Sequence, residues 1–186
     1  SGMLQKPEDA TEFGRKILAE SRRLLTLIED IIRLSRLDEG VRGEVTPVDL
    51  TALIQHCVQK LTPAAQNAQV SISASGNDPV LISGDHALLE EMLTNLLENG
   101  IKYNHAGGYV RARAEMADGR AVVTVADNGV GIAPEDQQRV FERFYRVDKS
   151  RSKQTGGTGL GLSIVKHGAQ VHHAQIAMQS ALGEGT

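Results

Sequence analysis

The 186-residue sequence contains no tryptophan, a single cysteine and only 3% aromatic residues. One cysteine cannot form a disulfide within the chain, so the protein suits a reducing compartment, and Cys57 is expected to be a small buried residue. A core with so few aromatic rings has to be built from Leu, Ile, Val and Ala. No apolar run approaches the roughly 20 residues of a membrane-spanning helix, and no signal peptide is recognisable.

Charge and size narrow the class further. The net charge of -3 provides no basic field that would attract nucleic acid, so we expect no nucleic-acid partner. The composition is that of a globular protein, and the length suits one domain with an appended element. The first three residues, Ser-Gly-Met, resemble an expression scar. We therefore interpret residues 1–8 as scar and linker, and the chain as a fragment of a longer protein.

Residues 9–40 form the first predicted unit, a long helix that ends at Gly40. Ile17, Leu24 and Ile31 recur every seven residues. The intervening positions on the same side of the helix are filled by Phe13, Leu27, Ile28 and Leu34, which completes one wide stripe. One helix cannot bury such a stripe alone. The stripe needs a partner helix, in this chain or in a second copy, and the sequence contains no second helix of that type. We therefore expect an incomplete helical hairpin that docks on a partner. A helix folded back on its own domain is the alternative.

Residues 44–186 predict a second unit that mixes strands and helices. Helices are expected at residues 50–67, 86–104 and 158–171, with Pro63 as a point where the first bends or breaks. Strands are expected at residues 44–49, 70–74, 80–83, 109–116, 120–126 and 174–179, and Asp118-Gly119 predicts a hairpin turn. This order predicts an α+β, two-layer sandwich, with helices on one face of a mixed β-sheet.

The helix at residues 86–104 carries a polar stripe opposite its leucines. Glu91, Asn95, Asn99 and Lys102 follow one another at spacings of four, four and three, which places them on one side. Asparagine is a poor helix former, so two of them favour a role beyond solvation. Amide oxygens one turn apart, with a lysine beyond, suit a hydrated Mg²⁺ beside phosphate. A solvated helix face is the simpler alternative.

Two glycine-rich segments flank a polar stretch. In the first, residues 126–132, Asp127 follows a strand and is an acceptor for a donor such as an exocyclic amine, and the glycines let backbone approach a ligand. In the second, residues 156–162, glycines open a helix, where free amides and the helix dipole favour phosphate. It is neither a Walker sequence nor a dinucleotide fingerprint. A plain turn and a flexible linker are the alternatives.

Residues 141–148 lie between the glycine segments and have the sequence FERFYRVD. Phe141 and Phe144 are expected to anchor a mobile segment to the core. Arg143 and Arg146, with Lys149, Arg151 and Lys153 beyond them, bring positive charge toward the expected phosphate position. The position between two glycine segments favours a lid over a nucleotide, and an ordinary charged surface loop is the alternative.

In this order the segments resemble the catalytic, ATP-binding domain of sensor histidine kinases, of the GHKL superfamily with its Bergerat fold. The resemblance covers about residues 44–186. Residues 24–40 resemble the second helix of that family's dimerisation and phosphoacceptor hairpin. Related ATPases of the gyrase and Hsp90 type share the glycine motifs but lack the FERFYRVD segment and the preceding helix.

The resemblance implies a role for each matching residue. Asp127 would bind the adenine amino group, Tyr103 would pack near the adenine, and Asn95 with Asn99 would hold Mg²⁺. Asn95, Asn99, Lys102 and Arg146 would serve the reaction, the two cations meeting phosphate together with Arg143. The lid would span about residues 133–158. The remaining nucleotide contacts fall in the glycine segments: Gly129, Gly131, Ile132, Gly157, Thr158, Gly159, Leu160, Gly161 and Leu162.

The match also has departures. The family's phosphoacceptor motif, in a His-Glu-Leu-Arg-Thr-Pro-like context, is absent, and none of the six histidines has such surroundings. Gly100 stands where alanine is commoner. His172-His173-Ala174 replaces a usual His-Gly-Gly turn, and we interpret this histidine pair as a surface turn rather than a metal site.

The implied activity is transfer of the ATP γ-phosphoryl group to a histidine of a partner hairpin, in two-component signalling. The partners would be that hairpin, a response-regulator receiver domain and a second copy of the chain through the long helix. The location would be the cytoplasmic part of a membrane-anchored sensor kinase. Two alternatives stay open: a nucleotide-sensing or docking module without transfer activity, and an ATPase or serine kinase of the same superfamily.

Overall fold

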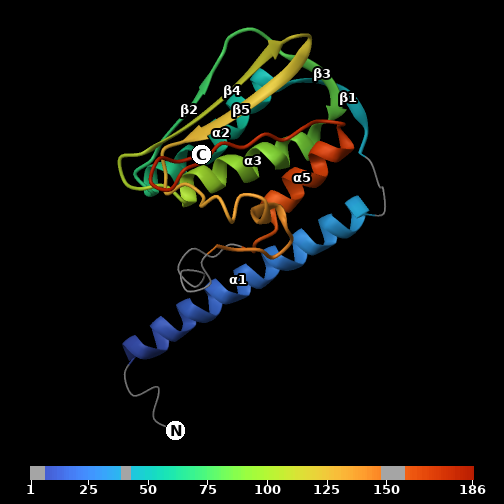
Figure 1. Ribbon diagram of the computed structural model, residues 1–186. Helices are drawn as coiled ribbons and strands as arrows, with labels where there is room; N and C mark the ends of the chain where they lie inside the picture. The colour runs from blue at the N-terminus through green and yellow to red at the C-terminus, as the bar shows by residue number, and fades with distance from the viewer. Residues whose placement is uncertain (1–6, 39–42, 148–157) are drawn as a thin grey trace.

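The computed structural model describes residues 7–38, 43–147 and 158–186. A long helix, α1 (Pro7–Asp38), extends away from a unit in which helices lie against strands (Figure 1). The strands of that unit are β1 (Val45–Asp49), β2 (Ser71–Ser75), β3 (Leu81–Asp85), β4 (Tyr109–Ala117) and β5 (Arg120–Asp127). Its helices are α2 (Leu50–Asn67), α3 (His86–Lys102), the 3₁₀ turn η1 (Arg139–Phe141) and α5 (Gly161–Val171).

The strands pair in two groups. β2, β4 and β5 form a three-stranded sheet in which β2 and β4 run parallel and β4 and β5 antiparallel. β1 and β3 form a separate antiparallel pair. α2 and α3 pack against the three-stranded sheet, and α5 packs beside α3 (Figure 1). The predicted α+β class, with helices covering a mixed sheet, is confirmed.

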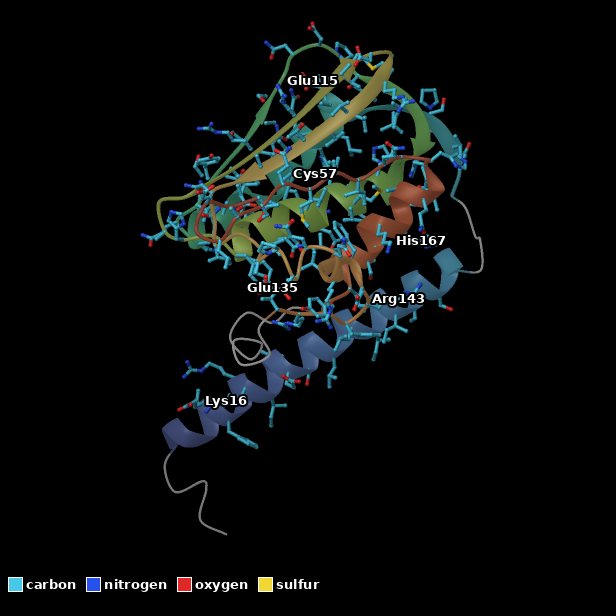
Figure 2. All side chains as sticks on the ribbon, in the orientation of Figure 1. Lys16, Cys57, Glu115, Glu135, Arg143 and His167 are labelled. Carbon is cyan, nitrogen blue, oxygen red and sulfur yellow. The ribbon has the colours of Figure 1, made fainter. Side chains whose placement is uncertain are left out.

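The core lies between the sheet and helices α2 and α3. Alternate residues of β4 point into it, and Val110 and Ala112 are almost fully buried while Arg111 faces outward. Leu97 of α3 meets this face, and Cys57 of α2 is fully buried as predicted (Figure 2). Burial raises the pKa of the Cys57 thiol, which favours its neutral form. The core is aliphatic, as the scarcity of aromatic residues predicts.

Local sequence signals explain why most helix and strand boundaries agree with those predicted from the sequence. Asp49 caps α2, since its carboxylate accepts the N–H groups of Thr51 and Ala52 at 2.9 and 3.4 Å. The helix continues through Pro63 without breaking. Asp118 and Gly119 both have positive φ, +49° and +73°, as the predicted two-residue hairpin turn between β4 and β5 requires.

Two predicted elements differ in the structure. Residues 174–180 form no strand, because within the described ranges no strand edge pairs with them, and alternation alone cannot hold an unpaired strand. The third predicted helix begins at Gly161 rather than at residue 158, because Gly159 has a left-handed φ of +75°. Gly40 lies outside the described residues.

The apolar stripe of α1 is largely open. Phe13, Ile17, Leu24, Ile28 and Ile31 are each about half exposed. Leu27 is the exception, because it packs against Leu160 and Ile164 of the main unit. The side chain of Leu34 lies outside those described. No helix in the described ranges has the length and apolar character needed to cross a membrane.

Gly100 of α3 is explained by its neighbour on β4. A methyl group at this position would lie 3.0 Å from both Cγ atoms of Val110, which is fully buried and has no room to move. Overpacking of this kind destabilises by about 1–3 kcal/mol, which exceeds the roughly 1 kcal/mol that alanine gains over glycine in a helix. We expect Gly100→Ala to lower the free energy of unfolding by about 1 kcal/mol, as measured by urea denaturation.

Gly14→Ala is the matched control, because a methyl group there meets no atom within 4 Å. We expect that substitution to raise helix content instead. A stabilising Gly100→Ala would contradict the tight contact between α3 and β4.

Candidate functional site

The two faces of α3 have different surroundings. Leu93, Leu97 and Ile101 are buried against the sheet. The four residues of the predicted polar stripe are all half-buried on the remaining surface: Glu91, Asn95, Asn99 and Lys102. They are therefore neither core residues nor a fully solvated face, which distinguishes them from an ordinary charged helix surface.

Asn95 meets the second glycine segment. Its Nδ2 donates a hydrogen bond to the Glu91 carbonyl at 2.9 Å, which leaves Oδ1 directed away from the helix backbone. That oxygen lies against the start of α5, since a Cβ atom at Gly161 would stand only 2.4 Å from it. Any side chain at position 161 would therefore displace the amide, so glycine is required for the close approach of α3 and α5.

Lys102 lies near a second cation. Its pKa is lowered from the usual range, first by burial and then by the positive charge of Arg146. Arg146 belongs to the segment predicted as a lid, so α3 and that segment bring two cations together. The ammonium also lies 5.3 Å from the centre of the Tyr103 ring. Within the described ranges, the half-buried Asn99 side chain has no protein partner.

Asp127 lies at the end of β5 beside the first glycine segment. Its Oδ1 accepts the N–H of Gly129 at 2.8 Å, and its own N–H donates to the carbonyl of Thr186 at 2.8 Å. Burial raises the pKa of the carboxyl, against a smaller opposing effect of the backbone N–H groups of Gly129 and Thr186. A half-buried carboxylate with few partners is a strong acceptor for a ligand that brings a donor.

The first glycine segment is tied to the end of α3. The N–H of Val130 donates to the Tyr103 carbonyl at 3.0 Å, and a Cβ at Gly129 would lie 2.4 Å from the same oxygen. Gly131 has a φ of +66°, and a Cβ there would lie 1.9 Å from the Ala181 carbonyl oxygen. Both glycines are therefore needed, because the backbone of this segment passes close to Tyr103 and Ala181. Asp127 is consequently held near the C-terminal end of α3, where Lys102 lies.

The segment between the glycine motifs closes on the start of α5. The N–H of Phe144 donates to the Gly159 carbonyl at 2.9 Å. The Tyr145 hydroxyl bonds to the Asp136 carboxylate, and the Arg139 guanidinium lies 4.2 Å from the centre of the Tyr145 ring.

The predicted anchoring role of Phe144 is wrong. Its side chain is 59% exposed, and its φ of +63° is unusual for an aromatic residue. The neighbouring Tyr145 is half-buried and contacts Asp136 through its hydroxyl and Arg139 through its ring, while Phe144 turns outward. Phe141 is half-buried, in line with the prediction.

The other predicted site residues have varied surroundings. Leu160 is fully buried and packs with Ile164, so its side chain is a core group rather than a ligand contact. Thr158 accepts the N–H of Leu160 at 3.3 Å, and Leu162 is half-buried. Arg143 is exposed. The residues outside the described ranges are Lys149, Arg151, Lys153, Gly156 and Gly157.

Two positioning residues escaped the sequence analysis. The N–H of Ile132 donates to Ser180 Oγ at 2.8 Å. Gln137 Nε2 donates to the carbonyls of Ile132 and Ser180 at 3.1 and 2.8 Å. They fix the start of the lid segment to the C-terminal residues. No motif marks them, because both are common polar residues far apart in the chain.

The histidine pair is only partly a surface turn. His173 is exposed with a φ of +52°, as a turn residue would be. His172 is half-buried instead, and its Nε2 accepts the N–H of Asp85 at 3.0 Å. Among the described residues, no three His, Cys, Asp or Glu side chains come together as a metal-binding group.

A magnesium ion therefore has to rely on other oxygen ligands. The amide oxygen of Asn95 points away from its helix and Asn99 has no protein partner in the described part of the chain. Mg²⁺ commonly binds few protein oxygens and takes its remaining ligands from substrate phosphates and water. The residues present fit such an ion.

A separate hollow lies elsewhere. It has a volume of about 380 Å³ and contains none of the predicted site residues, being lined by Gln137, Gln138, Phe141, Lys166, Ile176 and Met178. This hollow lacks the acidic acceptor and the pair of cations. We therefore place the candidate site at α3, the end of β5 and the start of α5.

Comparison with known proteins shows the family of the chain. A profile of the family described as "Histidine kinase-, DNA gyrase B-, and HSP90-like ATPase" matches residues 84–186. The chain belongs to this family. The match contains α3, both glycine segments and α5, which are the elements that form the candidate site.

Its relatives are sensor histidine kinases. The sensor-like histidine kinase SenX3 of Mycolicibacterium smegmatis (strain ATCC 700084 / mc(2)155) is 41% identical over 181 residues, which cover 97% of this chain and 47% of SenX3. The chain thus spans about half the length of the curated relatives it matches.

Solved structures agree as well. Full-length ShkA in complex with AMPPNP superimposes with a TM-score of 0.79 at 29% identity, over 97% of this chain and 37% of ShkA. Acinetobacter baumannii histidine kinase AdeS shares the fold, with a TM-score of 0.76 at 22% identity. The superposition covers 99% of this chain and 84% of the AdeS chain.

The surroundings of Lys102 predict a pH-dependent stability. Because its pKa is lower in the folded chain than in the unfolded one, the unfolded chain binds more protons between the two values, and stability rises with pH there. At neutral pH the buried charge opposes folding. We expect Lys102→Met to raise the melting temperature at pH 7, by an amount that shrinks as the pH approaches about 10.4, the ordinary lysine value.

Thermal melts followed by circular dichroism across this pH range measure the effect. Lys166→Met, at an exposed position on α5, is the control and should change little. A lower melting temperature for Lys102→Met at pH 7 would contradict this reading of its surroundings.

Proposed function

We propose that this chain binds Mg-ATP between α3, the end of β5 and the start of α5. The observation that carries the proposal is the pairing of Lys102, on the same face of α3 as Asn95, with Arg146 of the lid segment. Burial and the positive charge of Arg146 disfavour the charge of Lys102, and a bound polyphosphate relieves that repulsion. Asp127 supplies an acceptor for the base.

Each part of the nucleotide then has a partner. The adenine amino group donates to the Asp127 carboxylate, and Tyr103 packs near the ring. Asn95 and Asn99 provide amide oxygens for Mg²⁺, which would neutralise charge on the phosphates when bound. Lys102 and Arg146 orient the terminal phosphates. The backbone of Gly159 and Gly161 lets the start of α5 approach them, with the helix dipole favouring the anion.

We further propose that the bound ATP donates its γ-phosphoryl group to a histidine of a partner hairpin. The oxygen–phosphorus bond to ADP breaks as the imidazole nitrogen attacks phosphorus, and ADP leaves. This chain's groups position the phosphates and offset their charge, as in other phosphoryl transfers. The family's phosphoacceptor motif is absent from this sequence, so the acceptor comes from outside it.

The open stripe of α1 supports a partner of that kind. Five apolar side chains about half exposed on one helix need a second helix to cover them. We propose that the hairpin's first helix, or a second copy of the hairpin, covers this stripe. In the longer protein, a response-regulator receiver domain would accept the phosphoryl group, and the location would be the cytoplasmic side of a membrane anchor.

Base recognition is tested by comparing ATP with inosine triphosphate, which carries a carbonyl in place of the amino group. A hydrogen bond to a charged group contributes about 1.5–3 kcal/mol. We expect the wild-type chain to prefer ATP by roughly tenfold or more. Asp127→Ala should bind both nucleotides weakly and equally. Isothermal titration calorimetry measures the four affinities.

Asp78→Ala, on the exposed loop before β3, is the control and should keep the preference. An Asp127→Ala variant that still prefers ATP would remove Asp127 from the adenine contact.

Transfer is tested by mixing this chain with a separate hairpin that carries the acceptor histidine and with γ-labelled ATP. We expect acid-labile label on the hairpin, none on a hairpin whose histidine is replaced by glutamine, and none on this chain. ATP binding without transfer supports the nucleotide-sensing alternative. Steady phosphate release, or acid-stable label on serine, supports an ATPase or a serine kinase.

A further inference from the structure

His172 joins the end of α5 to the head of α3. Its Nδ1 lies 2.8 Å from the Gly168 carbonyl, one turn back in α5, and its Nε2 accepts the N–H of Asp85 at 3.0 Å. Only the neutral ring with its proton on Nδ1 makes both bonds, since a carbonyl cannot donate and an amide cannot accept through N–H. The imidazole is thus a two-ended link between helices.

Asp85 connects further elements to the same place. Its Oδ1 accepts the Leu88 N–H at 3.1 Å, which caps α3, and its Oδ2 accepts the Gly43 N–H at 3.0 Å. Gly43 is the first described residue on the main-unit side of α1. We call this set, Gly43, Asp85, Leu88, Gly168 and His172, the Asp85–His172 junction.

The Asp85–His172 junction is tightly packed. Gly84 is buried, and a Cβ there would lie 3.0 Å from His172 Cδ2, 3.1 Å from His172 Nε2 and 2.8 Å from Leu89 Cδ1. The imidazole therefore fills the space above the Gly84 backbone. Its position is set by packing as well as by hydrogen bonds.

The Asp85–His172 junction lies at one end of the paired helices α3 and α5, and the contact of Asn95 with Gly161 lies further along them. Asp85 is ten residues from Asn95 along α3, about 15 Å, and His172 is eleven residues from Gly161 along α5, about 16 Å. The head of α3 meets the end of α5, and Asn95 meets the start of α5. Between them, a Cβ at Gly168 would stand 2.4 Å from Met92 Sδ, so the helices touch there too.

We propose that His172 is a positioning residue of the nucleotide site, which fixes α5 along α3 so that Gly161 faces the Asn95 amide. The proposal rests on the proposed Mg-ATP site. If the junction opens, α5 is free to shift along α3. The start of α5, which forms the phosphate half of the site, is then no longer aligned with Asn95 on α3. The adenine half, formed by Asp127 and Tyr103, does not depend on α5 and keeps its geometry.

The test compares Mg-ATP with adenosine, which lacks phosphates. His172→Leu removes both hydrogen bonds at a similar volume. We expect it to weaken Mg-ATP binding about tenfold, a loss similar to that of one hydrogen bond, because the start of α5 is no longer aligned with α3. The affinity for adenosine should stay unchanged. His172→Gln keeps an acceptor near the Nε2 position and should recover most of the Mg-ATP affinity.

His173→Asn is the matched control, since this neighbour is exposed and asparagine tolerates its positive φ. It should bind both ligands like the wild type. If His172→Leu does not fold, His172→Asn takes its place, because it keeps a donor toward Gly168 but loses the acceptor for Asp85, and the same selective loss is expected.

Equal losses for adenosine and Mg-ATP would mean general destabilisation and would overturn the proposal. Unchanged Mg-ATP binding by a folded His172→Leu would overturn it as well, with the proposed function intact. A wild-type chain that binds neither ligand would instead overturn the proposed function and this inference together.

Discussion

The structure depends on α3, which packs against the sheet with one face and presents polar residues on the other. The leucine face of α3 packs on β4 so closely that position 100 has no room for a methyl group. This contact fixes the rotation of α3 about its axis. Asn95, Asn99 and Lys102 are consequently presented together on the opposite side, where α5 and the lid segment approach them.

The same arrangement makes the site's charges unfavourable in the unliganded chain. Burial lowers the pKa of Lys102 and raises that of Asp127, so each group is pushed toward its neutral form. Ionisable groups in such surroundings are frequent at functional sites. A ligand that brings an amine to Asp127 and phosphates to Lys102 compensates both, which is why the stability of the free chain and its proposed function oppose each other.

Strong local signals made much of the fold predictable. The start of α2 follows from the Asp49 cap, and the β4–β5 hairpin follows from Asp118-Gly119. The candidate site was predictable as a set of motifs, because glycines and helix spacing are readable one segment at a time. The comparisons bear out the family, and the individual site roles stay predictions.

Features that depend on distant neighbours were not predictable. Residues 174–179 alternate like a strand, but pairing is decided by an edge elsewhere in the chain. The outward turn of Phe144 follows from the contacts of Tyr145 with Asp136, and the inward turn of His172 from Asp85, which is 87 residues away. Gln137 and Ser180 likewise have meaning only once the chain has folded. Except for Phe144, whose deciding contact joins residues nine apart, these contacts link distant parts of the chain.

The proposed nucleotide position is between α3, the end of β5 and the start of α5. A titration of the ¹⁵N-labelled chain with Mg²⁺ and a non-hydrolysable ATP analogue, followed by NMR, tests it most directly. We expect the largest changes in amide chemical shift at Asn95, Asn99, Asp127, Gly129 and Gly161. Changes centred instead on the hollow lined by Phe141, Lys166 and Met178, or no changes at all, would contradict it.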